Sequence, residues 1–262
     1  MLRQSQGLRL LGTIDNGDDD PPTTLPSWAI RWKDPARPRS SCFAVGIYPL
    51  HPFNSSLGLG TSSHQVRGDG SLSLHGIYFD RIQSVFTITT PKSDFGPGLS
   101  SKFEKMYSEI TAQETPYVLA EDRLDAFAIT LTTGFFSSPD GLKVHRANFD
   151  AFWKAGTNQT LYLDNDIAGS EHSFIAYLLE RFPNGSIFIT GRGYIGYGSA
   201  YARRGDDCIV FQGGFSPFIV RRYRENGTLR LISEGYVHGI MNGEVASMVD
   251  SGEFVVEEII LS

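Results

Sequence analysis

The sequence is poor in cysteine, in basic residues and in long apolar runs, and each deficit excludes a class of protein. Two cysteines, Cys42 and Cys208, in 262 residues build neither a disulfide framework nor a cysteine-based zinc site. The formal net charge of −6 argues against nucleic acid or an anionic membrane as the main partner, because phosphate binding needs a basic face. No stretch approaches the roughly 20 apolar residues that cross a bilayer, and the N-terminus lacks the apolar core of a signal peptide. These deficits predict a cytoplasmic protein.

Apolar segments separated by glycines dominate residues 187–244. Isoleucine, valine and aromatic residues alternate there with short turns, of which Gly213-Gly214 and Asn226-Gly227 are the clearest. This pattern predicts an antiparallel meander that forms a small barrel or sandwich. Alternating apolar residues also predict a strand or hairpin over 71–89, with a bulge near Gly76.

Helical periodicity occupies the middle of the chain. Apolar residues three and four apart predict helices over 99–111, 121–136, 147–155 and 170–182. A last strand is predicted over 253–262. Central helices packed on antiparallel β elements indicate the α+β class.

The predicted organisation has three parts. Residues 1–24 form an N-terminal segment with an acidic, proline-containing linker. Residues 25–186 form a mixed region with three or four helices, and residues 187–262 form a glycine-rich antiparallel β module. Trp28 and Trp32 follow the linker at once, and we interpret them as anchors packed on the core.

The run Gly191–Gly196 has the glycine spacing of a dinucleotide-binding loop. Such a loop needs a helix that begins at the third glycine, and an acidic residue at the end of the next strand to hold a ribose. Only SAYARR lies between this run and Gly205-Asp206, and no acidic residue ends the next strand. The glycines therefore predict tight turns, and no cofactor is predicted.

Charged residues lie in pairs around the meander. Asp206 and Asp207 precede a strand, where neighbouring side chains diverge and no third ligand is close, so we predict a turn in place of a metal site. By the same alternation, the arginines in 221–224 predict a solvated hairpin end rather than a ligand patch.

His238 and Glu244 lie in a glycine-broken loop, where they resemble an acid–base pair. No nucleophile or metal partner accompanies them, so we favour a structural histidine and predict no catalytic residue. One alternative is a small hydrolase-like enzyme that uses Asp206, His238 and Glu244, with Arg192 or Arg204 holding an anion. This alternative requires the three side chains to converge in one pocket.

A second alternative is a ligand-binding barrel for carbohydrate or nucleic acid. It requires Tyr194, Tyr197 and Tyr201 to be exposed in a row beside basic residues, because bases and sugars stack on aromatic faces. Burial of these tyrosines would remove this alternative.

Two stretches, GYIGYGSAYARRGDDCIVFQGGFSPFIVRR and EGYVHGIMNGE, resemble the C-terminal region of fungal heterokaryon incompatibility proteins. The second, which includes Tyr236 to Glu244, is the specific one. Upstream, LPSWAIRW resembles the family's Leu-Pro-Ser-Trp segment, with Ile30 and Arg31 where Pro and Asp are usual, and SLSLHGIYFDRIQSV resembles its following strand. The resemblance covers about residues 25–244.

The resemblance implies a role in non-self recognition between fused fungal cells. In this family the incompatibility domain precedes the Leu-Pro-Ser-Trp segment, and we expect this chain to lack it. We therefore expect a non-enzymatic module that acts through contact with a protein partner, with no nucleic-acid or membrane partner. The candidate contact residues are those of the 192–204 and 238–244 loops and their borders: Arg192, Tyr194, Arg204, Asp206, Tyr236, His238 and Glu244.

Overall fold

The computed structural model describes the larger part of the chain. The described residues are 7–17, 25–29, 53–61, 63–88, 99–113, 117–134, 141–155, 174, 175, 178, 185–222 and 228–262. Trp32, Cys42, the Asn226-Gly227 turn and most of the helix predicted over 170–182 lie outside these residues.

One long strand, β2 (Leu72–Ile88), organises the sheet. Its N-terminal half pairs with β1 (Gln65–Val66), β9 (Glu257–Leu261) and β5 (Asp207–Phe211), and its C-terminal half pairs with β3 (Gly185–Thr190). The bulge predicted near Gly76 lies further along the strand, where the register shifts between Tyr78 and Asp80 and again between Ile82 and Ser84. Bulges bend a strand and increase its twist, so β2 serves two parts of one sheet.

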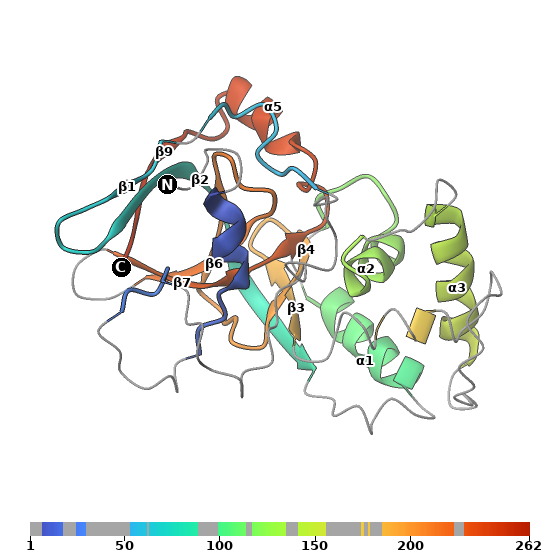
Figure 1. Ribbon diagram of the computed structural model, residues 1–262. Coiled ribbons are helices and arrows are strands. Elements are labelled where there is room, and N and C mark those ends of the chain that lie inside the picture. The colour runs from blue at the N-terminus through green and yellow to red at the C-terminus, as the bar shows by residue number, and fades with distance from the viewer. Residues whose placement is uncertain are drawn as a thin grey trace.

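Five strands close into a ring. β5 pairs with β6 (Phe218–Arg222), β6 with β7 (Leu229–Glu234), β7 with β9, β9 with β2, and β2 again with β5. The β7–β9 pair is parallel at Leu229 and Leu261, and the other pairs of the ring are antiparallel. β3, β4 (Ile195–Ser199) and β8 (Tyr236–Val237) extend the nine-stranded sheet away from the ring (Figure 1). The predicted α+β class and the C-terminal meander are confirmed.

A single apolar cluster takes residues from all five ring strands, which places it inside the ring. Its strand members are Leu72, Leu74, Ile209, Phe211, Phe218, Val220, Leu229, Leu231, Ile259 and Leu261. Leu11 and Ile14, in and just after the short helix η1 (Gly7–Thr13), and Trp28 complete the cluster. The N-terminal segment is thus part of the core that fills the ring, as the interpretation of Trp28 as an anchor requires.

Hydrogen bonds fix this N-terminal segment to β7. The Asn16 backbone N–H donates to the carbonyl of Ile232 (2.9 Å), and its side-chain amide donates to the carbonyl of Leu231 (2.7 Å). The Leu231 N–H donates in turn to the hydroxyl of Ser27 (3.0 Å), and the Trp28 indole N–H donates to the carbonyl of Gly70 (3.1 Å). The first three bonds satisfy backbone groups of β7, whose parallel pairing with β9 is short, and the fourth ties Trp28 to the turn before β2.

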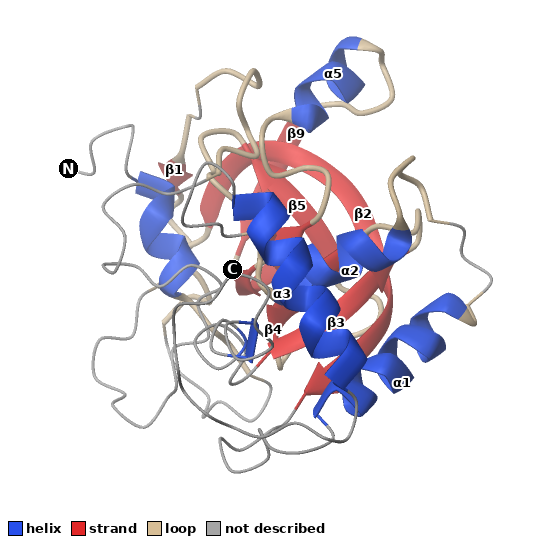
Figure 2. Ribbon diagram, turned by 90° about the vertical axis from the view of Figure 1, so that its right-hand side faces the viewer, coloured by secondary structure: helices blue, strands red, loops and turns tan. Residues whose placement is uncertain are grey.

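The helices α1 (Leu99–Thr111), α2 (Arg123–Leu131) and α3 (Gly141–Ala155) gather on one side of the molecule (Figures 1 and 2). Their apolar faces share a second cluster with β3 and β4. Asp122 caps α2 by accepting the N–H groups of Leu124 and Asp125, which explains why the helix begins just after it. α3 begins six residues earlier than the predicted 147–155, and the helix α5 (Glu244–Asp250) was not predicted.

His145 on α3 makes the stability of the helical layer dependent on pH. The side chain is 4% exposed, its Nε2 lies 2.8 Å from the hydroxyl of Thr132, and its ring packs edge-on against Phe174. Burial lowers the pKa of His145 from 6.5 to about 4. The unfolded chain therefore binds more protons than the folded chain between these two values, so stability is lost as the pH falls through that window.

We expect the His145→Gln variant to lose less stability than the wild type between pH 7 and pH 4. The difference is at most about 3 kcal/mol, since each unit of pKa shift corresponds to about 1.4 kcal/mol. Urea unfolding at several pH values measures it, and His64→Gln at an exposed position is the control. A His145→Gln variant whose stability falls as steeply with acid as the wild type's would contradict the assignment.

Candidate interaction surface

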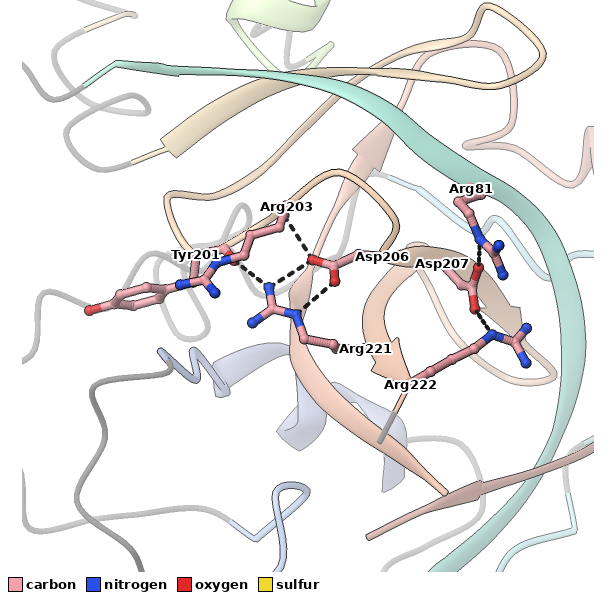
Figure 3. Close-up of polar contacts among 7 residues, drawn as sticks. All are labelled: Arg81, Tyr201, Arg203, Asp206, Asp207, Arg221 and Arg222. Carbon is pink, nitrogen blue, oxygen red and sulfur yellow. Dashed lines mark hydrogen bonds and ion pairs between the residues drawn. The ribbon is translucent and has the colours of Figure 1, made fainter. Parts of the chain in front are cut away.

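Asp206 and Asp207 point to opposite sides of the sheet, each toward a different arginine (Figure 3). Asp206 accepts two hydrogen bonds from Arg221, from Nε at 2.8 Å and from Nη2 at 2.9 Å, and a third from the backbone N–H of Arg203 at 2.8 Å. Arg221 also donates to the carbonyl of Tyr201 (2.8 Å). Burial raises the pKa of Asp206, and the hydrogen bonds from Arg221 oppose that rise. This pair ties the turn between β4 and β5 to β6.

Asp207 holds two arginines from the two strands beside it. Its Oδ1 accepts from the Nε of Arg81 on β2 (2.9 Å), and its Oδ2 accepts from the Nε of Arg222 on β6 (2.8 Å). The Asp207 side chain is 6% exposed, whereas those of Arg81 and Arg222 are 58% and 57% exposed. Adjacent aspartates and adjacent arginines therefore pair across the strands in a fixed order, as alternation along a strand dictates.

The Gly191–Gly196 run forms the turn of the β3–β4 hairpin, with no helix after it. The Arg192 N–H donates to Asp80 (2.8 Å), and its guanidinium contacts Glu253 (2.6 Å) and lies over the ring of Phe254. Tyr194 is 3% exposed and packs edge-on against Phe79. Arg192 and Tyr194 thus hold the hairpin against β2 and the segment after α5.

Tyr236 and His238 form a hydrogen-bonded chain with Glu121. The Tyr236 hydroxyl lies 2.9 Å from His238 Nδ1, and His238 Nε2 lies 2.7 Å from Glu121 Oε1. An ionised carboxylate only accepts, so Nε2–H donates to Glu121, and in the neutral imidazole Nδ1 accepts the hydroxyl proton of Tyr236. Tyr117 donates to the same Glu121 oxygen (3.1 Å), and burial raises the pKa of Tyr236. The chain joins the segment before α2 to β8.

We expect Tyr236→Phe to lower the free energy of unfolding by about 1 kcal/mol. The variant removes the hydrogen bond between Tyr236 and the partly buried ring of His238. Thermal or urea unfolding measures the change, and Tyr201→Phe, at a side chain that is 37% exposed, is the control with an effect within about 0.5 kcal/mol. Equal effects of the two variants would show that the Tyr236 hydroxyl does not stabilise the fold.

The three residues of the enzyme alternative each bind a different partner. Asp206 is bound by Arg221, His238 by Glu121 and Tyr236, and Glu244 by the backbone N–H of Asn242 (2.7 Å). No hydrogen bond joins any two of the three. Within the described residues, no group of three His, Cys, Asp or Glu side chains is placed to hold a metal ion.

The row of exposed tyrosines that the ligand-binding alternative requires is absent. Tyr194 and Tyr197 are 3% and 2% exposed, and only Tyr201 of the three reaches the surface. Tyr194 and Tyr197 pack in the two apolar clusters on either side of β3 and β4, because aromatic rings in a strand with both faces covered are buried whichever way they point. The ligand-binding alternative that needed an aromatic row is therefore wrong.

The turn between β4 and β5 is the most exposed part of the predicted contact loops. Tyr201, Arg203 and Arg204 are exposed there. Asp206 and Arg221 hold the backbone of the turn through hydrogen bonds to the Arg203 N–H and the Tyr201 carbonyl. Sequence reasoning singled out Arg204 and Asp206 but missed Arg81 and Glu121, which reach their partners from distant parts of the chain. The charge of Arg81 within the strand predicted over 71–89 is the signal that could have found the first of these.

Residues 141–256 match the family model of the Het-6 beta-barrel domain. Over part of its length, this chain is therefore similar to fungal heterokaryon incompatibility proteins. One such relative is heterokaryon incompatibility protein 6, OR allele, of Neurospora crassa, which is 36% identical over 69 residues. The match covers 26% of this chain and 10% of that relative, so the chain spans a small part of the relative's length. No solved structure matches the chain.

The matched range differs from the structural unit. It contains α3, β3 to β8 and α5, but β2 and β9, which the ring needs to close, lie outside 141–256. None of the helices in the described part of the chain has the length and apolar character required to cross a bilayer.

Proposed function

We propose that this chain is a non-enzymatic module of heterokaryon incompatibility, which acts in the cytoplasm through contact with a protein partner in non-self recognition or its regulation. The observation that carries the proposal is the match to the Het-6 beta-barrel domain over 141–256. The polar contacts support it, because Arg192, Asp206 and His238 bind other residues of the chain and so hold loops in place.

The contact surface that we propose is the turn at 201–205. Its exposed residues are Tyr201, Arg203 and Arg204, and tyrosine and arginine are the residue types most enriched where proteins bind one another. The Asp206–Arg221 pair pre-organises the turn, which reduces the entropy lost on binding. A partner surface of acidic and apolar residues would complement it.

Fusion of otherwise compatible fungal strains tests the proposal. One strain expresses the chain, and the surviving fraction of fused cells is counted against a strain without it. We expect the chain to change this fraction, and the Arg203→Glu/Arg204→Glu variant to lose the effect, since reversed charges repel an acidic partner. Circular dichroism verifies that the variant folds, and Lys143→Glu, at an exposed position on α3, is the charge-reversal control.

Two results would contradict the proposal. The chain could leave the survival of fused cells unchanged, which removes the role in incompatibility. Alternatively, the folded Arg203→Glu/Arg204→Glu variant could act as the wild type does, which removes the turn at 201–205 as the contact surface.

A further inference from the structure

A second basic site lies on the ring, apart from the turn at 201–205. The strands β2, β5 and β6 are neighbours in the ring, and they bring Arg81, Asp207 and Arg222 together near the start of β5 (Figure 3). Arg81 is directly opposite Asp207 in the register, and Arg222 reaches the same carboxylate from the other side. β2, which is far away in sequence, thus builds one cluster of charges with the consecutive strands β5 and β6.

Asp207 neutralises one charge but orients two guanidinium groups. Each arginine uses its Nε–H to bind a different oxygen of Asp207, which leaves its four Nη–H donors for other acceptors. Both side chains are more than half exposed, whereas Asp207 is 6% exposed. Among the described residues, neither guanidinium donates to any other acceptor. The two guanidinium groups are therefore oriented by the buried Asp207 carboxylate, and their remaining donors face solvent.

The groups next to this cluster are one aromatic ring and two further acids. The Arg222 guanidinium lies 5.2 Å from the ring centroid of Tyr78, which supports it from one side. Asp80 is already hydrogen-bonded to the backbone N–H groups of Arg81 and Arg192, at 2.8 Å each. Burial raises the pKa of Tyr78, and the nearby charges of Glu257 on β9 and of Asp207 raise it as well. Asp207 and the two further acids offset the charge of the two arginines, so the cluster offers oriented hydrogen-bond donors rather than a surplus of positive charge.

We propose that Arg81 and Arg222 bind a phosphoryl group carried on a side chain of the partner protein, such as phosphoserine. A dianionic phosphoryl group offers several acceptor oxygens, and planar guanidinium groups bind such oxygens in pairs. A protein source is favoured over a membrane, because the chain has a formal net charge of −6 and its basic site is confined to one pair. The identity of the partner as a protein rests on the proposed function.

The test titrates the full chain with N-acetyl-phosphoserine amide, and follows the arginine Nε–H signals by NMR. We expect saturable binding with a dissociation constant on the order of millimolar, since one small group is held by two side chains. Arg81→Gln and Arg222→Gln are each expected to weaken binding about tenfold, because each removes charge-assisted hydrogen bonds. The control is Arg67→Gln. Arg67 follows β1, is 35% exposed and pairs with Glu258 on β9, so this variant should bind the probe as the wild type does.

Each single variant leaves Asp207 one arginine, which favours a folded protein, and Arg222→Lys keeps the charge without the planar donors. The pH dependence gives a second readout. Binding should strengthen as the pH rises through about 6, where the phosphoryl group gains its second charge.

Three results would overturn the proposal. Binding could be absent, or insensitive to both arginine variants. N-acetyl-glutamate amide could bind as tightly as the phosphoserine probe, which would remove the preference for a phosphoryl group. Vesicles with anionic phospholipid could bind through the same arginines in place of the probe, which would assign the site to a membrane. Because the titration uses purified protein, it can fail while the fusion test succeeds, and the reverse.

Discussion

A fragment limited to residues 141–256, the range of the family match, is expected not to fold. It lacks β2, which pairs with β3, β5 and β9, and it lacks β9 as well. The apolar side chains of β2 that lose their place are Leu72, Leu74, Ile77, Phe79 and Ile82, each at most 6% exposed. At about 2 kcal/mol for each buried side chain, their removal costs about 10 kcal/mol, which matches the whole stability of a typical domain of about 5–15 kcal/mol.

A split chain is the matched control for this fragment. Residues 1–137 and 138–262, produced together, retain all nine strands, with the break between α2 and α3. We expect the two pieces to associate and to show the cooperative thermal transition by circular dichroism that 141–256 lacks. A cooperative transition in the isolated 141–256 fragment would contradict the closed ring as the folding unit.

The two adjacent aspartates are expected to differ sharply in their contribution to stability. Asp206→Ala should lower the free energy of unfolding by about 3 kcal/mol, because it removes the carboxylate that accepts two hydrogen bonds from Arg221, whose charged side chain is only 20% exposed. Asp207→Ala should cost about 1 kcal/mol, because Arg81 and Arg222 are mostly exposed and water replaces the lost contacts.

Urea unfolding of both variants measures this difference, since the two aspartates are neighbours in sequence and similarly buried. The double variant Asp206→Ala/Arg221→Met should recover part of the lost stability, because it also removes the charge of the Arg221 side chain. Equal losses for Asp206→Ala and Asp207→Ala would mean that the burial of the partner arginine does not set the cost.

Local patterns predicted the elements, and long-range pairing decided their arrangement. The alternation over 71–89 and the glycine-broken strands over 187–244 predicted β structure, and the structure contains β2 and the meander there. The sequence of β2 or of β9 alone did not indicate that they close the ring, because the residue pattern of a strand does not specify a pairing partner that is far away in the chain. The prediction missed the first residues of α3, because residues 141–146 contain few apolar residues and their helical periodicity is weak.

The candidate site divides in the same way. Alternation correctly predicted that Asp206 and Asp207, and likewise Arg221 and Arg222, would face opposite ways. It could not supply the partner of His238, because Glu121 approaches from a segment 117 residues away. The tyrosine row failed for a related reason: the sequence does not show that both faces of β4 are covered.

The survival of fused cells that carry the Glu121→Gln variant tests most directly whether contact, and not catalysis, accounts for the function. The variant weakens the Glu121–His238–Tyr236 chain, which is the arrangement in this protein that most resembles an acid–base relay, and leaves the turn at 201–205 unchanged. We predict that a folded Glu121→Gln protein changes fused-cell survival as the wild type does. Loss of the effect, with a thermal transition like that of the wild type, would contradict a module that acts through the turn at 201–205 alone and would assign a direct role to the Glu121–His238–Tyr236 chain.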